Sequence, residues 1–124
     1  MTVGQTGAAS TIVSEVNTAQ AVGSGSLAVF STPMMIALME QAACNCLDTH
    51  MAGGQTTVGT EISIQHMAAS PLGAEITATA TITSVDGRKV SFAVSAHDGK
   101  AEIGKGTHQR VVIDAERFMA KLQG

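Results

Sequence analysis

The sequence predicts a single α+β domain, in which an antiparallel sheet of five strands wraps around one long buried helix. The segment that begins at Thr32 is apolar nearly all round at helical spacing, as expected for a buried helix. From Thr57 onward the apolar residues recur with a period of two, which indicates strands, and short turns separate these strands. Strands joined by short turns are antiparallel. With 124 residues, the range 1–124 forms one domain large enough to bury a core.

The expected order of elements is a strand, the helix, and then four strands. Residues 11–22 include enough β-branched side chains for the first strand, and the Gly-Ser run at 23–26 ends it. Thr32 is expected at the N-cap of the helix, followed by Pro33 in the first turn, where a missing N–H does no harm. The helical pattern continues to about Met51.

Alternation of apolar and polar residues defines the later strands. One face of the second strand is expected to carry Val58, Thr60, Ile62, Ile64 and His66. This parity turns the imidazole toward the helix. The other expected features are a strand over 76–83, a hairpin at Asp86-Gly87, a strand over 90–96, a turn at 97–100, a strand over 101–113 with a bulge near Gly104 and Gly106, and a short helix capped by Asp114 that runs to Leu122.

Composition excludes several classes of protein. The net charge of −3 provides no basic surface for nucleic acid, and Trp and Tyr, on which bases stack, are absent. The N-terminus lacks the pattern of a signal peptide, and the longest apolar run, 34–39, is too short to span a membrane. We therefore expect a cytoplasmic protein without a membrane or nucleic-acid partner.

The two cysteines, Cys44 and Cys46, stand two positions apart in the expected helix. Side chains at this spacing point in different directions, so the two thiols cannot form a disulfide. No histidine stands at ligand spacing from them, so we expect no metal site and interpret both as small buried side chains.

Two polar residues are candidates for catalysis because they are expected inside. Glu40 is the only charged residue between Ser31 and Leu47, and a buried carboxylate must find partners or keep its proton. The plain alternative is a glutamate at the edge of the exposed side of the helix. A lone inward His66 is usually a hydrogen-bonded core residue, but a buried Glu facing a buried His can hold a proton and activate a nucleophile or water.

Thr32 and Arg110 each have two roles open to them. Capping alone explains a threonine before a proline, but a hydroxyl at a helix N-terminus also lies beside free N–H groups, a place suited to an oxyanion. Glu40 follows eight positions after Thr32, roughly 12 Å along the axis, so the two cannot touch, although a substrate between them could meet both. Arg110 could bind a phosphate or anchor Glu40, although a surface arginine is the commoner meaning.

Six motifs between about Thr32 and Lys121 form a specific pattern. They are Val94-Ser95-Ala96-His97-Asp98-Gly99, Glu102-Ile103-Gly104, Gly106-Thr107-His108-Gln109-Arg110, Leu38-Met39-Glu40, Val58-Gly59-Thr60 leading to His66, and Pro71 with Gly73. In register over this range, they resemble the motifs of the fluoroacetyl-CoA thioesterase family, whose members have the hotdog fold. The element order given above is also that of the hotdog fold.

The resemblance implies a hotdog acyl-CoA thioesterase that hydrolyses short acyl-CoA thioesters as a homodimer. Coenzyme A is then part of the substrate, and no metal or redox cofactor is implied. The family's catalytic residues fall on Thr32, Glu40 and His66, its glycine near the reacting carbonyl on Gly59, and its arginine of the last strand on Arg110. Pairing of two copies would also cover the open edges of a lone sheet.

In the expected mechanism His66 is the general base, is held by Glu40, and activates Thr32 or a water against the thioester carbonyl. Backbone N–H groups near Gly59 or the helix start would stabilise the oxyanion.

The segment before the helix departs from the family pattern. Fluoroacetyl-selective members have an aromatic-rich gate there, whereas residues 23–30 contain Phe30 as their only aromatic side chain. With Phe30 taken as a substrate contact, we expect a broader range of short-to-medium acyl-CoA thioesters. Two other functions stay open: a hotdog dehydratase or hydratase, which also uses a His and a carboxylate, and a non-catalytic acyl-CoA-binding module.

Overall fold

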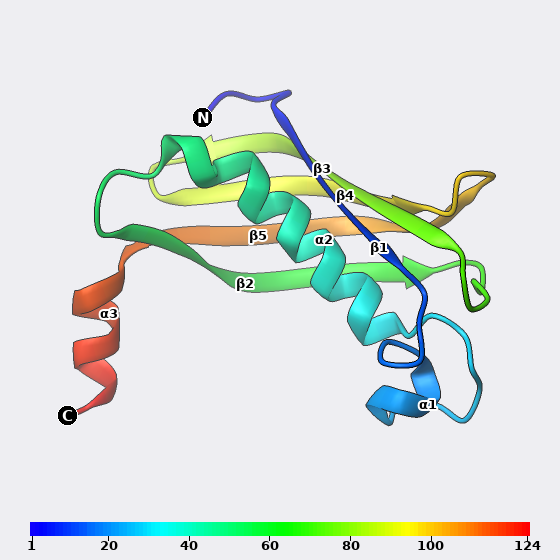
Figure 1. Ribbon diagram of the computed structural model, residues 1–124. Coiled ribbons are helices and arrows are strands. Elements are labelled where there is room, and N and C mark those ends of the chain that lie inside the picture. Colours follow the sequence, from blue (N-terminus) through cyan, green and yellow to red (C-terminus); the bar gives the residue numbers. More distant parts are fainter.

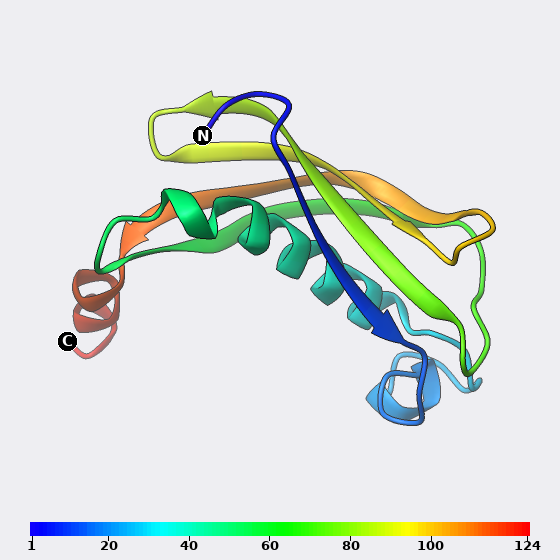
Figure 2. The ribbon, with the colours of Figure 1, turned by 45° about the horizontal axis from the view of Figure 1, so that its top comes forward.

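The computed structural model describes residues 1–124 and contains one antiparallel sheet of five strands. Its elements are β1 (Thr6–Ile12), α1 (Ala19–Val22), α2 (Thr32–Leu47), the 3-10 turn η1 (Asp48–His50), β2 (Gln55–His66), β3 (Glu75–Asp86), β4 (Lys89–His97), β5 (Glu102–Asp114) and α3 (Ala115–Leu122). The strands lie in the order β1-β3-β4-β5-β2, so β1 and β2 form the two edges. Figures 1 and 2 show the sheet curling around α2, which confirms the predicted α+β arrangement.

The core lies between α2 and the concave face of the sheet. The helix packs mainly against β1 and β3. Seven of its residues are buried: Met35, Leu38, Met39, Ala42, Ala43, Cys46 and Leu47. The sheet supplies alternate residues of β3 and β4, as the period of two predicts: Ile76, Ala78, Ala80, Ile82, Val90, Phe92, Val94 and Ala96. Many of these side chains are small, so the helix and the sheet pack closely.

At Gly7 the backbone of β1 lies directly against α2. A Cβ at this position would lie 2.5 Å from the backbone nitrogen of Cys46 and 2.7 Å from its Cα. Backbone atoms cannot move aside as the end of a flexible side chain can, so only glycine allows this contact. The close packing favours a first strand made of small residues.

The predicted first strand over 11–22 is wrong in its bounds. β1 spans Thr6–Ile12, and most of the predicted range contains a turn and α1. Thr18 caps α1, because its Oγ1 accepts from the Ala21 N–H at 3.2 Å. The residues of β1 include glycine and alanine, which disfavour strands, but pairing with β3 and packing against α2 outweigh this local preference.

The helix is also capped differently from the prediction. Ser31 is the N-cap of α2, and its Oγ accepts from the Met34 N–H at 3.2 Å. Thr32 is the first helical residue instead, so its hydroxyl is free of the capping role. At the other end α2 stops at Leu47, and the predicted continuation toward Met51 is the 3-10 turn η1.

A β-bulge changes the parity of β2. The register with β5 shifts between Gly59 and Glu61, which adds one residue to β2. Beyond the bulge His66 faces α2 together with Ile62 and Ile64, as predicted. The prediction is wrong for Val58 and Thr60, since the extra residue moves both off this face.

Before the bulge Thr57 and Gly59 face inward. Residues directly opposite each other in an antiparallel pair point to the same face. Gly59 stands opposite Arg110 and Thr57 stands opposite Val112, and both of these β5 residues are buried. The bulge therefore aims two separate parts of β2 at the helix.

Three further predicted features are confirmed. A tight turn with Gly87 at φ 62° joins β3 to β4, and the β4–β5 register shifts next to Gly104. Asp114 caps α3 by accepting from the Arg117 N–H at 3.0 Å.

Both cysteines are free thiols in the structure. Cys46 is buried, but the interpretation of Cys44 as buried is wrong, since its side chain is half-buried. None of the helices combines the length and the apolar character needed to cross a membrane.

Candidate active site

Thr32 and His66 form a direct hydrogen bond at one end of the sheet. Thr32 Oγ1 and His66 Nδ1 lie 2.7 Å apart. The hydroxyl arrives as the first residue of α2 and the imidazole as the last residue of β2. Gly104 stands opposite His66 on β5, where a Cβ would lie 2.6 Å from the sulfur of Met35. The end of the Met35 side chain therefore packs directly on Gly104 beside the imidazole.

Burial governs the protonation of His66. Desolvation lowers the pKa of its ring below the ordinary 6.5; the nearby backbone of Ala68 partly offsets this, although it makes no hydrogen bond of acceptable geometry to the ring. When the neutral ring accepts the Thr32 proton at Nδ1, its own hydrogen sits on Nε2. This Nε2 is buried and has no hydrogen-bond partner within the chain. Buried donors normally have hydrogen-bond partners, so the Nε2–H of His66 needs one further acceptor.

A pocket of about 300 Å³ opens beside this pair. Its lining residues come from α1, the loop after α1, the start of α2 and the segment after β2: Ala19, Ser24, Val29, Phe30, Thr32, His66, Met67, Ala68 and Ala69. Phe30, the predicted substrate contact, lines the pocket, but it is only 1% exposed and belongs to the core. Its ring is a fixed wall and not a mobile gate. Small apolar walls beside a few polar groups suit a short acyl chain.

Glu40 lies in a second cluster, two turns further along α2. Its Oε2 accepts from Arg110 Nη1 at 3.2 Å, while 40% of the glutamate side chain stays exposed. Arg110 is almost fully buried and also donates from Nε to Thr57 Oγ1 at 2.9 Å and from Nη2 to the Thr57 carbonyl at 3.1 Å. Of the two roles open to Arg110, the structure supports the anchoring of Glu40.

His108 completes this cluster from β5. Its Nδ1 lies 2.9 Å from the Glu61 carbonyl, which can only accept, so Nδ1 carries the ring hydrogen. Nε2 is then a lone pair that accepts from Arg110 Nη1 at 3.2 Å. Burial first, and then the charge of Arg110, lower the pKa of His108, which agrees with a neutral ring. The 4.0 Å contact of His108 Nε2 with Glu40 is therefore proximity and not an ion pair.

Gly59 has no side chain because this cluster leaves no room for one. A Cβ would lie 2.8 Å from Glu40 Oε2 and 3.2 Å from Arg110 Nη1. The bulge turns this position inward, and the carbonyl that follows it at Glu61 binds His108. Within one chain, Gly59 therefore lies beside the carboxylate of Glu40 and in a different cluster from the Thr32–His66 pair.

The six predicted site residues thus form two groups within one chain. The first contains Thr32, His66 and Phe30, and the second contains Glu40, Gly59 and Arg110. The expected contact in which Glu40 holds His66 is not made inside a single chain, because Glu40 bonds Arg110 instead. No three or more His, Cys, Asp or Glu residues gather closely enough to hold a metal ion.

Sequence reasoning missed two residues of the second group, Thr57 and His108. His108 shares the inward parity of Arg110 two positions later, so a signal for it was present. Thr57 could not be found from alternation, since the bulge reverses the parity at its position.

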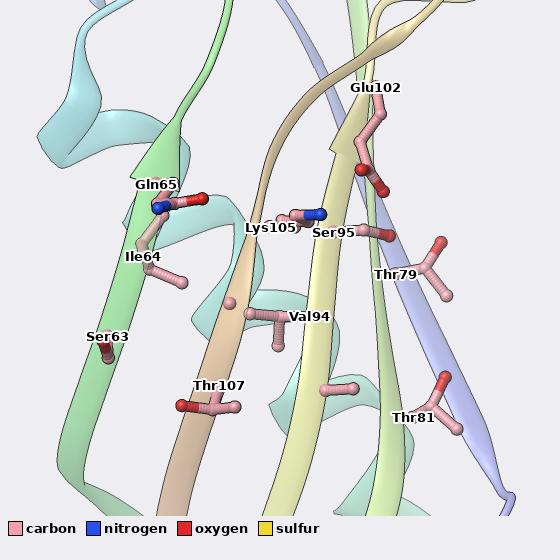
Figure 3. Close-up of a pocket in the computed structure, with 12 residues that line it drawn as sticks. Ser63, Ile64, Gln65, Thr79, Thr81, Val94, Ser95, Glu102, Lys105 and Thr107 are labelled. Carbon is pink, nitrogen blue, oxygen red and sulfur yellow. The ribbon is translucent and has the colours of Figure 1, made fainter.

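The largest hollow of the chain lies elsewhere. It measures about 540 Å³ and occupies the face of the sheet opposite α2 (Figure 3). Its lining is mostly polar and includes Ser63, Thr79, Ser95 and Thr107, but no histidine or cysteine. Glu102 and Lys105 also line this open, hydroxyl-rich surface beside Ser95, but neither side chain makes a hydrogen bond to a hydroxyl there. The smaller pocket next to Thr32, with its hydroxyl–imidazole pair, is therefore the candidate active site.

Comparison with known proteins identifies the family. Residues 13–116 match the family described as fluoroacetyl-CoA-specific thioesterase, FlK. A fluoroacetyl-CoA thioesterase from Streptantibioticus cattleyicolor is 46% identical over 95 residues, which are 77% of this chain and 68% of that protein. The chain belongs to this family of acyl-CoA thioesterases.

Solved structures share the fold of this thioesterase. A crystal structure of a mutant of FlK matches with a TM-score of 0.93 and 38% identity, over 99% of this chain and 96% of that chain. A hot-dog-like protein from Thermanaerovibrio acidaminovorans is 26% identical and matches with a TM-score of 0.88, over 98% and 90% of the two chains. The predicted hotdog fold is confirmed.

The free energy of unfolding of this thioesterase is expected to fall as the pH drops below about 6.5. His66 and His108 have lowered pKa values, so below the ordinary histidine pKa of 6.5 the unfolded chain binds protons that the folded chain does not. Their contribution is fully present above that pKa and decreases toward the lowered values, by about 1.4 kcal/mol for each pKa unit and group. Urea unfolding at a series of pH values measures this slope.

His108→Gln removes one buried titrating ring and should flatten the slope. His97→Gln, at the exposed last residue of β4, is the matched control and should leave it unchanged. Equal slopes for the wild type and His108→Gln would contradict the neutral, buried state of His108.

Proposed function

We propose that this thioesterase hydrolyses short-to-medium acyl-CoA thioesters at a site completed by two copies of the chain. The observation that carries the proposal is the 2.7 Å hydrogen bond between Thr32 and His66 beside an apolar pocket. A hydroxyl bonded to a neutral imidazole suits an activated nucleophile, or a base that activates water in the same place.

His66 acts as the general base in this proposal. Nδ1 takes the proton of the Thr32 hydroxyl, or of a water beside it, while the oxygen attacks the thioester carbonyl. The C–S bond then breaks, and the coenzyme A thiolate leaves with the proton held by the imidazolium. When Thr32 is the nucleophile, water repeats the cycle on the acyl-enzyme and releases the acid. Desolvation of His66 keeps the base neutral and ready.

The start of α2 stabilises the oxyanion. Thr32 is the first helical residue, so the positive end of the helix dipole lies at the reacting carbonyl. Pro33 has no N–H, and the Met34 N–H is bonded to Ser31. The dipole and the Thr32 N–H are therefore the groups that this end of the helix offers.

A homodimer supplies the acceptor that His66 Nε2 lacks. β2 is a 12-residue edge strand, and an open edge of this length invites pairing with a second copy. Two-fold symmetry makes the paired β2 strands antiparallel, so the His66 end of one strand lies beside the first half of the other. That half contacts the second cluster, and the exposed side of Glu40 of the partner subunit then faces His66. The carboxylate accepts from Nε2 and stabilises the imidazolium.

The pocket sets the range of acyl groups. Phe30 is a rigid wall, whereas the mouth is lined by small residues such as Ala19 and Ser24. A single small substituent in an apolar pocket changes binding by only about 1–3 kcal/mol even when the fit is good. We therefore propose little preference between acetyl and fluoroacetyl beyond their intrinsic reactivity, and acceptance of longer chains.

The other two functions make different demands. A dehydratase or hydratase needs its His and carboxylate beside the acyl chain beyond the carbonyl, and a binding module needs neither. The Thr32 hydroxyl on His66 favours attack on the carbonyl itself.

The first test compares kcat/KM for acetyl-, fluoroacetyl-, butyryl- and hexanoyl-CoA under one set of conditions. We expect free thiol from several of them, and a fluoroacetyl preference within the factor that about 1–3 kcal/mol allows. Enoyl absorbance without free thiol would indicate a dehydratase, and no reaction with any ester would favour a binding module. A preference of about a thousandfold or more would contradict the proposed breadth.

The second test replaces Glu40 by Gln, which keeps the shape and removes the charge. The variant is expected to fold, with a lower free energy of unfolding because Arg110 loses its counter-charge, and to lose at least about a hundredfold in kcat, the usual contribution of an acid–base group. Glu75→Gln, an exposed carboxylate at the start of β3, is the control. Full hydrolysis by Glu40→Gln would remove Glu40 from the mechanism.

The third test asks whether one site uses both chains. In a mixed dimer, one chain carries His66→Ala and the other carries Glu40→Gln. If each site takes His66 from one chain and Glu40 from the other, one of the two sites keeps both residues. If each site lies within a single chain, neither site keeps both. We expect activity to reappear on mixing, up to about half that of the wild type, from two nearly inactive parents. A mixed dimer as inactive as its parents would mean that the two residues act within one chain.

A further inference from the structure

A small basic pocket lies where α3 meets the turn between β3 and β4. Its volume is about 200 Å³, and its lining residues are Arg88, Ile113, Asp114, Arg117, Phe118 and Lys121. Three of the chain's seven basic residues therefore line one hollow, although the chain as a whole carries a net charge of −3. The pocket is distinct from the one beside Thr32.

The charges of this pocket are available to a ligand. The only carboxylate within 4.0 Å of a basic side chain anywhere in the chain is Glu40, so Arg88, Arg117 and Lys121 have no ion-pair partner. Arg88 donates only to the Val112 carbonyl, at a long 3.4 Å. The one acid in the lining, Asp114, is occupied by the N–H that it caps on α3. The pocket thus offers three cations against one carboxylate.

The substrate's coenzyme A part carries phosphates that must meet some group on the protein. Arg110 does not serve, because its guanidinium is 7% exposed and is bonded to Thr57, His108 and Glu40. The basic pocket is also too far from Thr32 of its own chain. It lies at the Gln55 end of β2, since the Ala115 N–H bonds the Gly54 carbonyl at 2.9 Å, and the 12 residues of β2 span roughly 36 Å.

The partner's pocket is near instead. Antiparallel pairing through β2 sets the Gln55 end of one chain beside the His66 end of the other. In Figure 1, α3 hangs from the end of β5 beyond the β2 edge, on the side that a second copy would occupy. None of its residues is buried in the single chain, and Phe118, Met119 and Leu122 form an exposed apolar stripe at helical spacing. A second copy paired through β2 would cover this stripe.

We propose that Arg88, Arg117 and Lys121 bind the phosphates of the acyl-coenzyme A whose thioester lies in the partner subunit's Thr32–His66 pocket. This inference rests on the proposed dimer and names the part of it that recognises coenzyme A. Each active site then draws its acyl pocket from one chain and its nucleotide site from the other.

The direct test is binding of free coenzyme A, which does not depend on turnover. The double variant Arg117→Gln/Lys121→Gln should weaken the Kd measured by calorimetry by about tenfold and reduce its dependence on salt. Lys100→Gln/Lys105→Gln removes the same charge from another part of the chain and should match the wild type. An equal Kd for all three proteins would overturn the proposed site.

A second measurement separates the phosphates from the acyl group. The double variant should raise KM for butyryl-CoA, and this defect should disappear with butyryl-pantetheine, which lacks the nucleotide. Inhibition by inorganic phosphate should also weaken in the variant. A loss of equal size with both esters would show that the two residues act on folding or on the acyl site, and would overturn the proposal.

Mixed dimers decide which chain supplies the basic pocket. When His66→Ala and Arg117→Gln/Lys121→Gln are placed on different chains, the live His66 site faces an intact α3, and KM should be normal. When all three changes are on one chain, the live site faces the altered α3, and KM should rise. The opposite pattern would overturn the assignment across the interface, while a monomer in light scattering would refute the dimer itself.

Discussion

Burial of the Arg110 guanidinium is the constraint on which the second half of the site depends. A buried cation is tolerated only when its N–H groups are paired and its charge is balanced. Thr57 accepts two of the hydrogen bonds, His108 accepts a third through a lone pair, and Glu40 supplies the opposite charge. Two of these partners depend on local features of β2: the bulge turns Thr57 inward, and Gly59 leaves the space that the Glu40 carboxylate fills. Glu40 is thus positioned by β5 and by its own helix, and not by the imidazole that it is proposed to serve.

The helix imposes a fixed distance between the two halves. Thr32 and Glu40 are eight positions apart on the same rigid element, so within one copy the Glu40 carboxylate bonds Arg110 and does not reach the Thr32–His66 pair. An antiparallel pair of edge strands resolves this, because it places opposite ends of two identical strands side by side. His66 stands at one end of β2, and the bulge beside Gly59 stands before its middle. On this view the unpaired Nε2 of His66 and the exposed side of Glu40 are complementary halves that a single chain leaves open.

The parts of the fold that were predictable are those that local pattern determines. Alternation predicted β3 and β4, the Asp86-Gly87 pair predicted the turn between them, and Asp114 predicted the start of α3. What failed depended on contacts between distant segments. β1 includes the poor strand formers Gly7, Ala8 and Ala9, which pack against α2. The choice of Ser31 over Thr32 as the cap depends on which hydroxyl meets the helix N–H groups. The alternation of residues does not reveal a bulge, so the inward orientation of Thr57 could not be predicted. The residue types of the site could be predicted, but their partners could not, because pairing across a helix and a sheet depends on register.

The division of the site between rigid and open parts bears on how selectivity arises. The acyl pocket is bounded by Phe30, a core residue that cannot close over a small substrate, and by short side chains at its mouth. Binding energy from a remote part of a substrate can still be used to orient its reacting end. Charged groups that hold the nucleotide would therefore let the enzyme recognise coenzyme A strongly while discriminating little among acyl groups. Such an enzyme would recognise coenzyme A at α3 and hydrolyse the thioester at the start of α2. Two-fold pairing would bring α3 of one chain beside the start of α2 of the other.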